Sequence, residues 1–192
     1  MSIPKNCLRT IVLGVFLTAL SGCSPSRPEE NAMVSQDRRS AGFFPTVTGR
    51  NLTGQSFTFP DNLRKDYNLI AVAFLRQQQA DVDTWIAQME PLEAQLPSFA
   101  FFEVPTIRKM NPFSRWFIYQ GMRGGIPSQA ARQRTVTLHI DKEPFKKALG
   151  IESEETIYLF LTDRTGKILW QTSGSWSEDK HQQLLAVLNP SL

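Results

Sequence analysis

The sequence predicts an α/β fold in which a sheet lies between layers of helices, and two observations predict it. An apolar, partly β-branched run at 69–75 is typical of a strand that is buried on both faces. A helical pattern begins near Asp81, and a second apolar run follows at 98–104. We therefore expect a strand–helix–strand unit, whose two strands are parallel and whose helix crosses one face of the sheet.

The helix of this unit has an apolar side. Helical spacing brings together Val82, Trp85, Ile86, Met89, Leu92 and Leu96. We expect Trp85 to be a core residue rather than a platform for a ligand. Asp81 or Asp83 is expected to accept hydrogen bonds from N–H groups of the first turn. Pro91 lies inside the pattern and predicts a kink or a restart of the helix.

Further elements flank this unit on both sides. A turn composition at Asn51–Gly54 lies between Val47 and the alternating residues 57–59, which predicts an N-terminal hairpin. Gly166 supplies the positive φ that a later hairpin turn needs. After the unit, the predicted elements are a strand at 135–140, a short helix at 143–149, a hairpin of strands 156–162 and 167–171, and a final helix from its N-cap Ser177 to about Leu188.

This element order predicts a thioredoxin-like, and more closely a peroxiredoxin-like, three-layer sandwich with an N-terminal hairpin and a central insertion. In redox proteins of this type the reactive cysteine sits at the strand–helix junction, where free N–H groups and the helix dipole stabilise a thiolate. Here the junction holds Arg76, the glutamines 77–79 and Ala80, and no cysteine. The sequence thus predicts the fold without its redox chemistry.

The N-terminus has the pattern of an export signal with a lipid attachment site. Lys5 and Arg9 precede an apolar segment at 10–20, which is too short for a comfortable membrane span. Leu20-Ser21-Gly22-Cys23 resembles the bacterial lipobox, in which the cysteine receives a diacylglyceryl group and becomes the new N-terminus. An uncleaved anchor or a plain secretory signal is the alternative. The expected domains are a signal peptide at 1–22, the lipidated Cys23 with a flexible tether at 23–43, and a folded domain at 44–192.

Lipidation determines the expected location and one expected partner. It would attach the protein to the membrane through Cys23, and Ser24 favours the periplasmic face of the outer membrane in a bacterial cell envelope. Since Cys7 would be removed with the signal peptide, the mature protein would have no free thiol. Removing Lys5 and Arg9 lowers the formal net charge from +3 to +1, with 19 basic and 18 acidic residues left, so we expect no nucleic-acid partner.

Several motifs resemble one family through the order in which they occur. The motifs are Phe57-Thr58-Phe59-Pro60-Asp61-Asn62-Leu63, Ala73-Phe74-Leu75-Arg76, Glu103-Val104-Pro105, Gly121-Met122-Arg123-Gly124-Gly125-Ile126-Pro127, Asp141-Lys142 and the run from Tyr158 to Trp170. The combination is similar to the mitochondrial ATP synthase assembly factor family called ATP-ten, a thioredoxin-like group with bacterial relatives, over about 44–188. The resemblance implies a chaperone for a membrane subunit of the ATP synthase rather than an enzyme. The expected lipid anchor lies outside the cytoplasm, so the mitochondrial client does not simply carry over.

No catalytic or metal-binding pattern stands out in the expected domain. Peroxidase chemistry and disulfide exchange need a thiolate, which the mature domain would not supply. Soft metal sites need cysteine together with histidine, whereas the histidines are His139 and His181, on separate elements. His139 and Asp141 are predicted on the same side of a strand, where a structural contact is expected. We therefore expect no catalytic residue, no cofactor and no metal.

The middle segment, 104–140, is the strongest candidate for function. It contains basic residues and no acidic one, and the aromatic residues Phe113, Trp116, Phe117 and Tyr119 interleave with Arg108, Lys109, Arg115, Arg123, Arg132 and Arg134. On a short helix this mixture suits an anionic membrane surface or an acidic partner. Alternatively, the aromatic side chains are core and the arginines are a solvated rim or internal ion-pair donors. The predicted partner-binding residues are Arg108, Arg115, Trp116, Met122, Arg123 and Arg134.

Arg123 is favoured among these residues because it falls in a family-like motif. The glycines at 121, 124 and 125 would allow close backbone approach or a mobile loop. We expect a membrane-anchored, non-catalytic protein that acts through a protein partner in the cell envelope and assists assembly of a membrane complex. Two alternatives stay open: a redoxin-type thiol oxidoreductase or peroxidase, and a module that binds an apolar or anionic small molecule in a pocket beside Arg123.

Overall fold

The computed structural model describes residues 42–126 and 128–188. The predicted signal peptide, the lipidation of Cys23 and most of the tether lie outside these residues, so they stay predictions. Within the described part of the chain, no helix has the length and hydropathy needed to cross a membrane.

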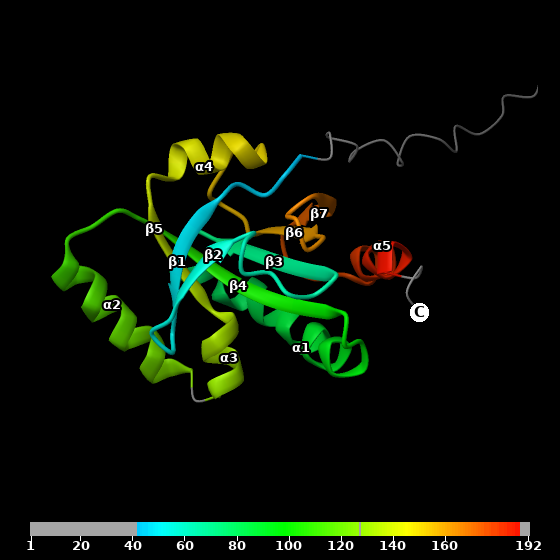
Figure 1. Ribbon diagram of the computed structural model, residues 1–192, viewed down its shortest axis with the longest axis horizontal. Helices are drawn as coiled ribbons and strands as arrows, with labels where there is room; N and C mark the ends of the chain where they lie inside the picture. The colour runs from blue at the N-terminus through cyan, green and yellow to red at the C-terminus, as the bar shows by residue number, and fades with distance from the viewer. Residues whose placement is uncertain (1–41, 127, 189–192) are drawn as a thin grey trace, which may run out of the picture. The chain divides into compact units, whose positions relative to one another are not determined.

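The centre of the domain is a seven-stranded sheet with the strand order β2-β1-β5-β4-β3-β6-β7 (Figure 1). Strands β3, β4 and β5 are parallel to their neighbours in this set, and the other pairings are antiparallel. The strands are β1 (Val47–Asn51), β2 (Ser56–Phe59), β3 (Tyr67–Ala73), β4 (Phe99–Arg108), β5 (Val136–Ile140), β6 (Tyr158–Thr162) and β7 (Ile168–Ser173). The predicted hairpins and the parallel strand–helix–strand unit are therefore confirmed.

Five α-helices and one 3-10 turn accompany the sheet in the described residues. They are η1 (Arg76–Gln78), α1 (Gln79–Gln95), α2 (Pro112–Gly125), α3 (Gln129–Arg134), α4 (Lys142–Leu149) and α5 (Glu178–Leu188). Asp141 and Ser177 cap α4 and α5, since each side chain accepts a backbone N–H bond in the first turn. The turn glycine Gly166 has φ +86, as predicted.

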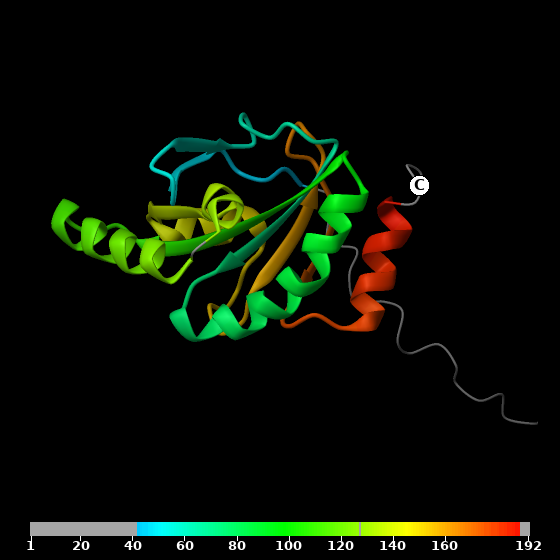
Figure 2. The ribbon, with the colours of Figure 1, turned by 90° about the horizontal axis from the view of Figure 1, so that it is seen from below.

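The alternation along β3 shows how the layers form. Leu69 and Ala71 face a core cluster that includes Trp85 of α1, whereas Ile70 and Val72 face a second cluster that includes Phe145 of α4. Helices α1 and α5 thus cover one face of the sheet and α4 the other (Figures 1 and 2). This is the predicted three-layer sandwich, and Trp85 is fully buried in it, as expected.

Some local predictions were wrong. β3 ends at Ala73 and α1 begins at Gln79, because η1 takes up the residues expected to form a polar loop. α1 continues through Pro91 as one helix, so there is no restart. Asp81 and Asp83 do not cap it: their carboxylates accept bonds from the side chains of Ser175 and Gln79.

Candidate interaction surface

The junction after β3, where a redox protein of this fold would hold its cysteine, is filled by Gln78. Its Oε1 accepts hydrogen bonds from the backbone N–H groups of Phe74 and Leu75, at 2.8 and 3.1 Å. Its Nε2 donates to the carbonyl oxygen of Glu154 at 2.7 Å. The side chain is only 2% exposed. Gln78 therefore ties the end of β3 to the loop before β6.

This arrangement gives the junction a structural role. Both polar atoms of the Gln78 amide have partners, and those partners are backbone groups that would otherwise need water. The nearest exposed residues, Arg76 and Gln77, offer no thiol, and residues 42–126 and 128–188 contain no cysteine. The described part of the chain supplies no thiolate for redox chemistry.

A buried ion-pair network lies on the α1 side of the sheet. Arg134 of α3 contacts Glu103 of β4 at 3.3 Å and Glu90 of α1 at 2.5 Å. Burial raises the pKa of Glu103, and the attraction of Arg134 opposes that rise without cancelling it. The Arg134 side chain is 11% exposed, so this cation is used inside the domain. Arg134 was a predicted partner-binding residue, but the structure agrees with the alternative, in which it is an internal ion-pair donor.

Helix α2 lies at the edge of the domain in both ribbon views (Figures 1 and 2). The Asn111 side chain caps it by accepting a bond from the Ser114 N–H, and Pro112 suits its first turn. The Tyr119 hydroxyl donates to the Leu52 carbonyl oxygen at 3.0 Å, and the Met122 sulfur lies 3.9 Å from the Thr137 hydroxyl. These contacts fix the inner side of α2 against the β1–β2 hairpin and β5.

The opposite side of α2 carries large apolar side chains with little cover. Phe113, Trp116 and Phe117 are 76%, 58% and 69% exposed, and the rings of Phe113 and Trp116 stack at 6.5 Å. Helical spacing places them together, and we call this set the aromatic face of α2. Tyr119, in contrast, is partly buried. The structure thus divides the aromatic residues that the sequence presented as one group.

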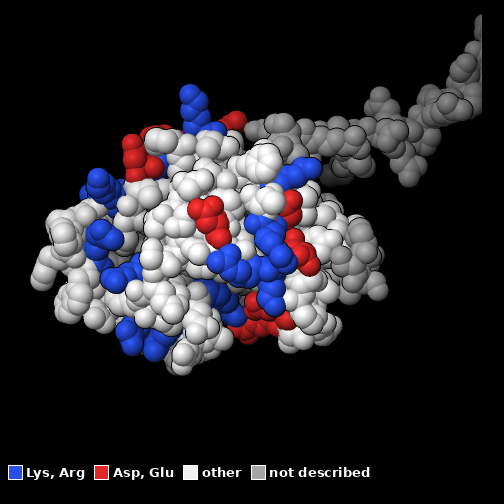
Figure 3. Space-filling model, in the orientation of Figure 1, with Lys and Arg blue, Asp and Glu red and all other residues white. Residues whose placement is uncertain are grey.

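Exposed cations lie on α2 and in the chain just before it. Arg108 at the end of β4, Lys109, Arg115 and Arg123 are exposed, and none makes an ion pair with any residue that the structure describes. Figure 3 shows blue and uncharged surface, without red, over the part of the molecule where α2 lies. Arg132 is different, because it donates to the carbonyl oxygens of Ile126 and Arg123 and so caps the end of α2. The region is therefore apolar and positively charged.

The three glycines of the middle segment do not serve close packing inside the domain. Gly121, Gly124 and Gly125 all lie within α2, so the predicted mobile loop at these positions is wrong. A Cβ added at any of them would meet nothing within 4 Å. The space beside them is open to a partner.

Two features of this region were not predicted from the sequence. No role was predicted for Gln78, although its position at the strand–helix junction could have indicated one. Phe113 and Phe117 were not among the predicted partner-binding residues, although their spacing with Trp116 places the three on one helix face.

His139 and Asp141 do not share a strand, since β5 ends at Ile140 and Asp141 caps α4. The described residues contain no group of three or more side chains suited to hold a metal ion.

Solved structures with this arrangement are mostly redox proteins. A thiol:disulfide interchange protein from Bacteroides sp. is 16% identical with TM-score 0.52, over 79% of this chain and 91% of its own. BsSco, of the Sco family of cytochrome c oxidase assembly proteins, is 12% identical with TM-score 0.53, over 78% of this chain and 93% of its own. A protein from Chlorobium tepidum described as a thiol:disulfide interchange protein DsbE is 18% identical with TM-score 0.50, over 78% and 98%. At these identities the likeness shows the thioredoxin-like fold.

Sequence comparison identifies the family. No curated protein matches the chain. The family model described as ATP10 protein matches residues 32–190, which is most of the chain and includes the whole described domain. The motif order and the thioredoxin-like fold agree with this match. The chain therefore belongs to the ATP10 protein family.

Proposed function

We propose that this protein is a non-catalytic assembly factor, held at the cell envelope membrane by a lipid on Cys23, that binds a protein subunit of a membrane complex through α2. The observation that carries the proposal is the aromatic face of α2. Three large aromatic side chains are exposed together on one helix, apart from the two buried core clusters of the domain. Contiguous exposed apolar surface of this kind marks interaction sites.

The chemistry around the aromatic face indicates what kind of partner fits. Aromatic side chains and arginines are the residues that contribute most at protein interfaces. The unpaired cations Arg108, Arg115 and Arg123 favour a partner with acidic groups beside its apolar contact. Gly121 and Gly125 have the spacing at which two helices approach closely. A helical, partly acidic subunit of a membrane complex matches all three features.

The junction supports a non-catalytic role. Gln78 fills the place of the redox site, and its amide is fully hydrogen-bonded. The ATP10 family match supports an assembly role. A redoxin-type enzyme would need a thiolate within the domain. Thiol-dependent peroxide turnover by the full-length chain would contradict the proposal.

In-cell photocrosslinking tests the proposal. A photoreactive amino acid replaces Phe117 on α2 or, as a matched control, the exposed Gln77 at the junction. We expect a specific membrane protein to be captured from position 117 and not from position 77. Capture from the junction instead, or recovery of lipid alone from position 117, would contradict a protein partner on α2.

A further inference from the structure

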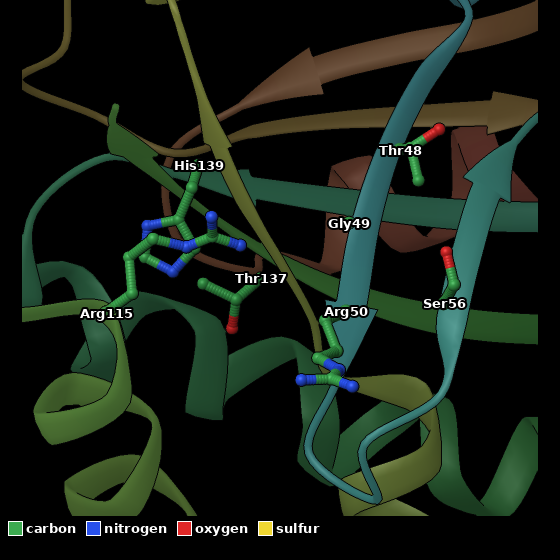
Figure 4. Close-up of a pocket in the computed structure, with 7 residues that line it drawn as sticks. All are labelled: Thr48, Gly49, Arg50, Ser56, Arg115, Thr137 and His139. Carbon is green, nitrogen blue, oxygen red and sulfur yellow. The ribbon is translucent and has the colours of Figure 1, made fainter. Parts of the chain in front are cut away.

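A polar pocket of about 320 Å³ lies between the β1–β2 hairpin, β5 and α2 (Figure 4). Two of its residues were described above, Arg115 as an exposed cation of α2 and Thr137 as the contact of Met122. Its side chains are Thr48, Arg50, Ser56, Arg115, Thr137 and His139. The volume is at the small end of the range for ligand sites, which favours a small ligand or a single chemical group.

Strand register explains why these polar residues meet. Arg50 lies opposite Ser56 of β2 on one side and opposite Thr137 of β5 on the other. Side chains at paired positions of antiparallel strands point to the same face, so these three form one row. Thr48 and His139 lie two residues from Arg50 and Thr137 along their strands and therefore share that face.

Gly49 holds this row together. A Cβ at Gly49 would lie 2.7 Å from the Thr137 carbonyl oxygen and 2.8 Å from the side chains of Val136 and Leu138. Any side chain here would push β1 away from β5. The close approach of the two strands thus depends on glycine, and it sets the floor of the pocket.

The pocket contains two guanidinium groups and no carboxylate. The hairpin segment 43–60 and the segment 104–140, which build it, contain no acidic residue. Nε of Arg50 donates to the Gly54 carbonyl oxygen at 2.8 Å, and no described side chain accepts its terminal N–H groups. Arg115 has no side-chain hydrogen bond to a described residue. Most donors of the two arginines are therefore free to bind an anion.

His139 also lacks a partner. Its Nδ1 is buried and makes no hydrogen bond in the described structure. Burial lowers the pKa of His139, and the adjacent positive charge of Arg115 lowers it further. The two side chains lie beside each other in Figure 4. A buried polar atom without a partner calls for an explanation, and an anion between these groups would supply one.

We propose that this pocket, which Arg50, Arg115, Ser56 and Thr137 help to line, binds a phosphate-type oxyanion. Guanidinium groups match the tetrahedral oxygens of phosphate with paired hydrogen bonds. The two positive charges match a doubly charged phosphate better than they match a singly charged carboxylate ligand. A free phosphate ester and a phospholipid headgroup share this chemistry. Arg115 is also one of the cations named in the proposed function, but no residue of the aromatic face of α2 lines the pocket, so the proposal does not depend on that function.

Calorimetric titration of the full-length chain, in neutral detergent, with inorganic phosphate tests the pocket. Arg115→Gln is expected to weaken phosphate binding at least tenfold. Arg123→Gln, which removes the same charge from the same helix outside the pocket, is expected to change binding less than twofold. Equal losses in the two variants, or no binding by the unaltered chain, would overturn the proposal.

A second variant guards against misfolding. Arg50→Gln approaches the pocket from β1, and it is expected to give a loss similar to that of Arg115→Gln with an unchanged melting temperature. Proton NMR gives an independent readout, since bound phosphate should raise the pKa of His139, which lies beside Arg115, and leave the ring resonances of His181 in place. An unmoved His139 at saturating phosphate would place the anion elsewhere and contradict the proposal.

Vesicle binding separates the two sources of the anion. If a lipid headgroup occupies the pocket, vesicles of phosphatidylglycerol bind more strongly than those of phosphatidylcholine, and Arg115→Gln removes the difference while Arg123→Gln keeps most of it. If a free phosphate ester is the ligand, phosphate binds and Arg115→Gln leaves vesicle binding unchanged. If no membrane protein is captured at position 117 while the chain still binds phosphate, only the proposed function is contradicted.

Discussion

The junction after β3 and helix α2 both contain arginine and no acidic residue, yet the two regions differ in how their side chains are paired. At the junction Gln78 is buried, and each of its polar atoms bonds to the backbone. On α2 the aromatic rings are exposed and the cations of Arg115 and Arg123 have no acidic partner among the described residues. The polar groups of one region are paired within the domain, whereas the other region presents the groups that we propose a partner covers.

Under the proposed function, this thioredoxin-like fold keeps its framework and uses a different working surface. The strand–helix junction is the place where the fold offers N–H groups to a thiolate. Here a glutamine amide uses two backbone N–H groups of that place, so it contributes stability. The insertion between β4 and β5 does not form this internal connection. It extends away from the core and presents the groups that a binding site needs.

The largest expected effect is at the junction. Gln78→Ala leaves the N–H groups of Phe74 and Leu75 and the carbonyl of Glu154 without partners, which should lower the free energy of unfolding by about 3 kcal/mol. Gln77→Ala, its exposed neighbour, should change it by less than about 0.5 kcal/mol. Denaturant unfolding measures both. Equal stability of the two variants would show that the junction is not the internal tie inferred here.

The buried ion pair should make stability depend on pH in a defined direction. Because burial raises the pKa of Glu103 above its ordinary value of 4.5, the folded state binds this proton more tightly than the unfolded state. The free energy of unfolding should therefore fall as pH rises from about 4.5 to the raised pKa, by about 1.4 kcal/mol for each unit of the rise.

Glu103→Gln should remove this slope, and Glu90→Gln, at the exposed end of the same network, should keep it. Unfolding measured across that pH window distinguishes them. A slope that survives Glu103→Gln would mean that another group carries it. The cations of α2 differ, since Arg115 and Arg123 make no ion pair within residues 42–126 and 128–188.

Glycine-to-alanine substitutions have a smaller expected effect, and they test whether Gly121 serves the fold or a partner. Gly121 lies in a helix with open space at its Cβ, so Gly121→Ala should stabilise the domain by about 0.5–1 kcal/mol. Gly150 also has open space, but its φ is +66, so Gly150→Ala should destabilise the domain by about 1 kcal/mol. Thermal unfolding measures both. If Gly121→Ala also weakens partner capture, the partner approaches the backbone of α2 closely.

The elements of the sandwich could be predicted from the sequence because apolar runs and turn residues act locally. The run at 69–75 and the turn at 163–166 each carry their own signal. The same kind of signal does not distinguish Gln77, Gln78 and Gln79. Only the position of the Glu154 carbonyl, 76 residues away, selects the middle one for burial.

The candidate surface could be predicted only in outline. A basic segment with aromatic residues is visible in the sequence, but apolar side chains occur on both sides of α2. The side that packs is decided by the β1–β2 hairpin, where the Leu52 carbonyl accepts the Tyr119 hydroxyl. Similarly, Arg134 is bound by Glu103 and Glu90, which lie 31 and 44 residues earlier in the chain, and so it does not contribute to the candidate surface.

The central claim is that this protein works through the aromatic face of α2 and not through the junction. The most direct measurement is the dissociation constant of the membrane protein captured at position 117 for the full-length chain carrying Phe113→Ser, Trp116→Ser and Phe117→Ser together. We predict that affinity falls more than tenfold while the free energy of unfolding changes by less than about 0.5 kcal/mol. Unchanged affinity in this variant, with the fold intact, would contradict the claim.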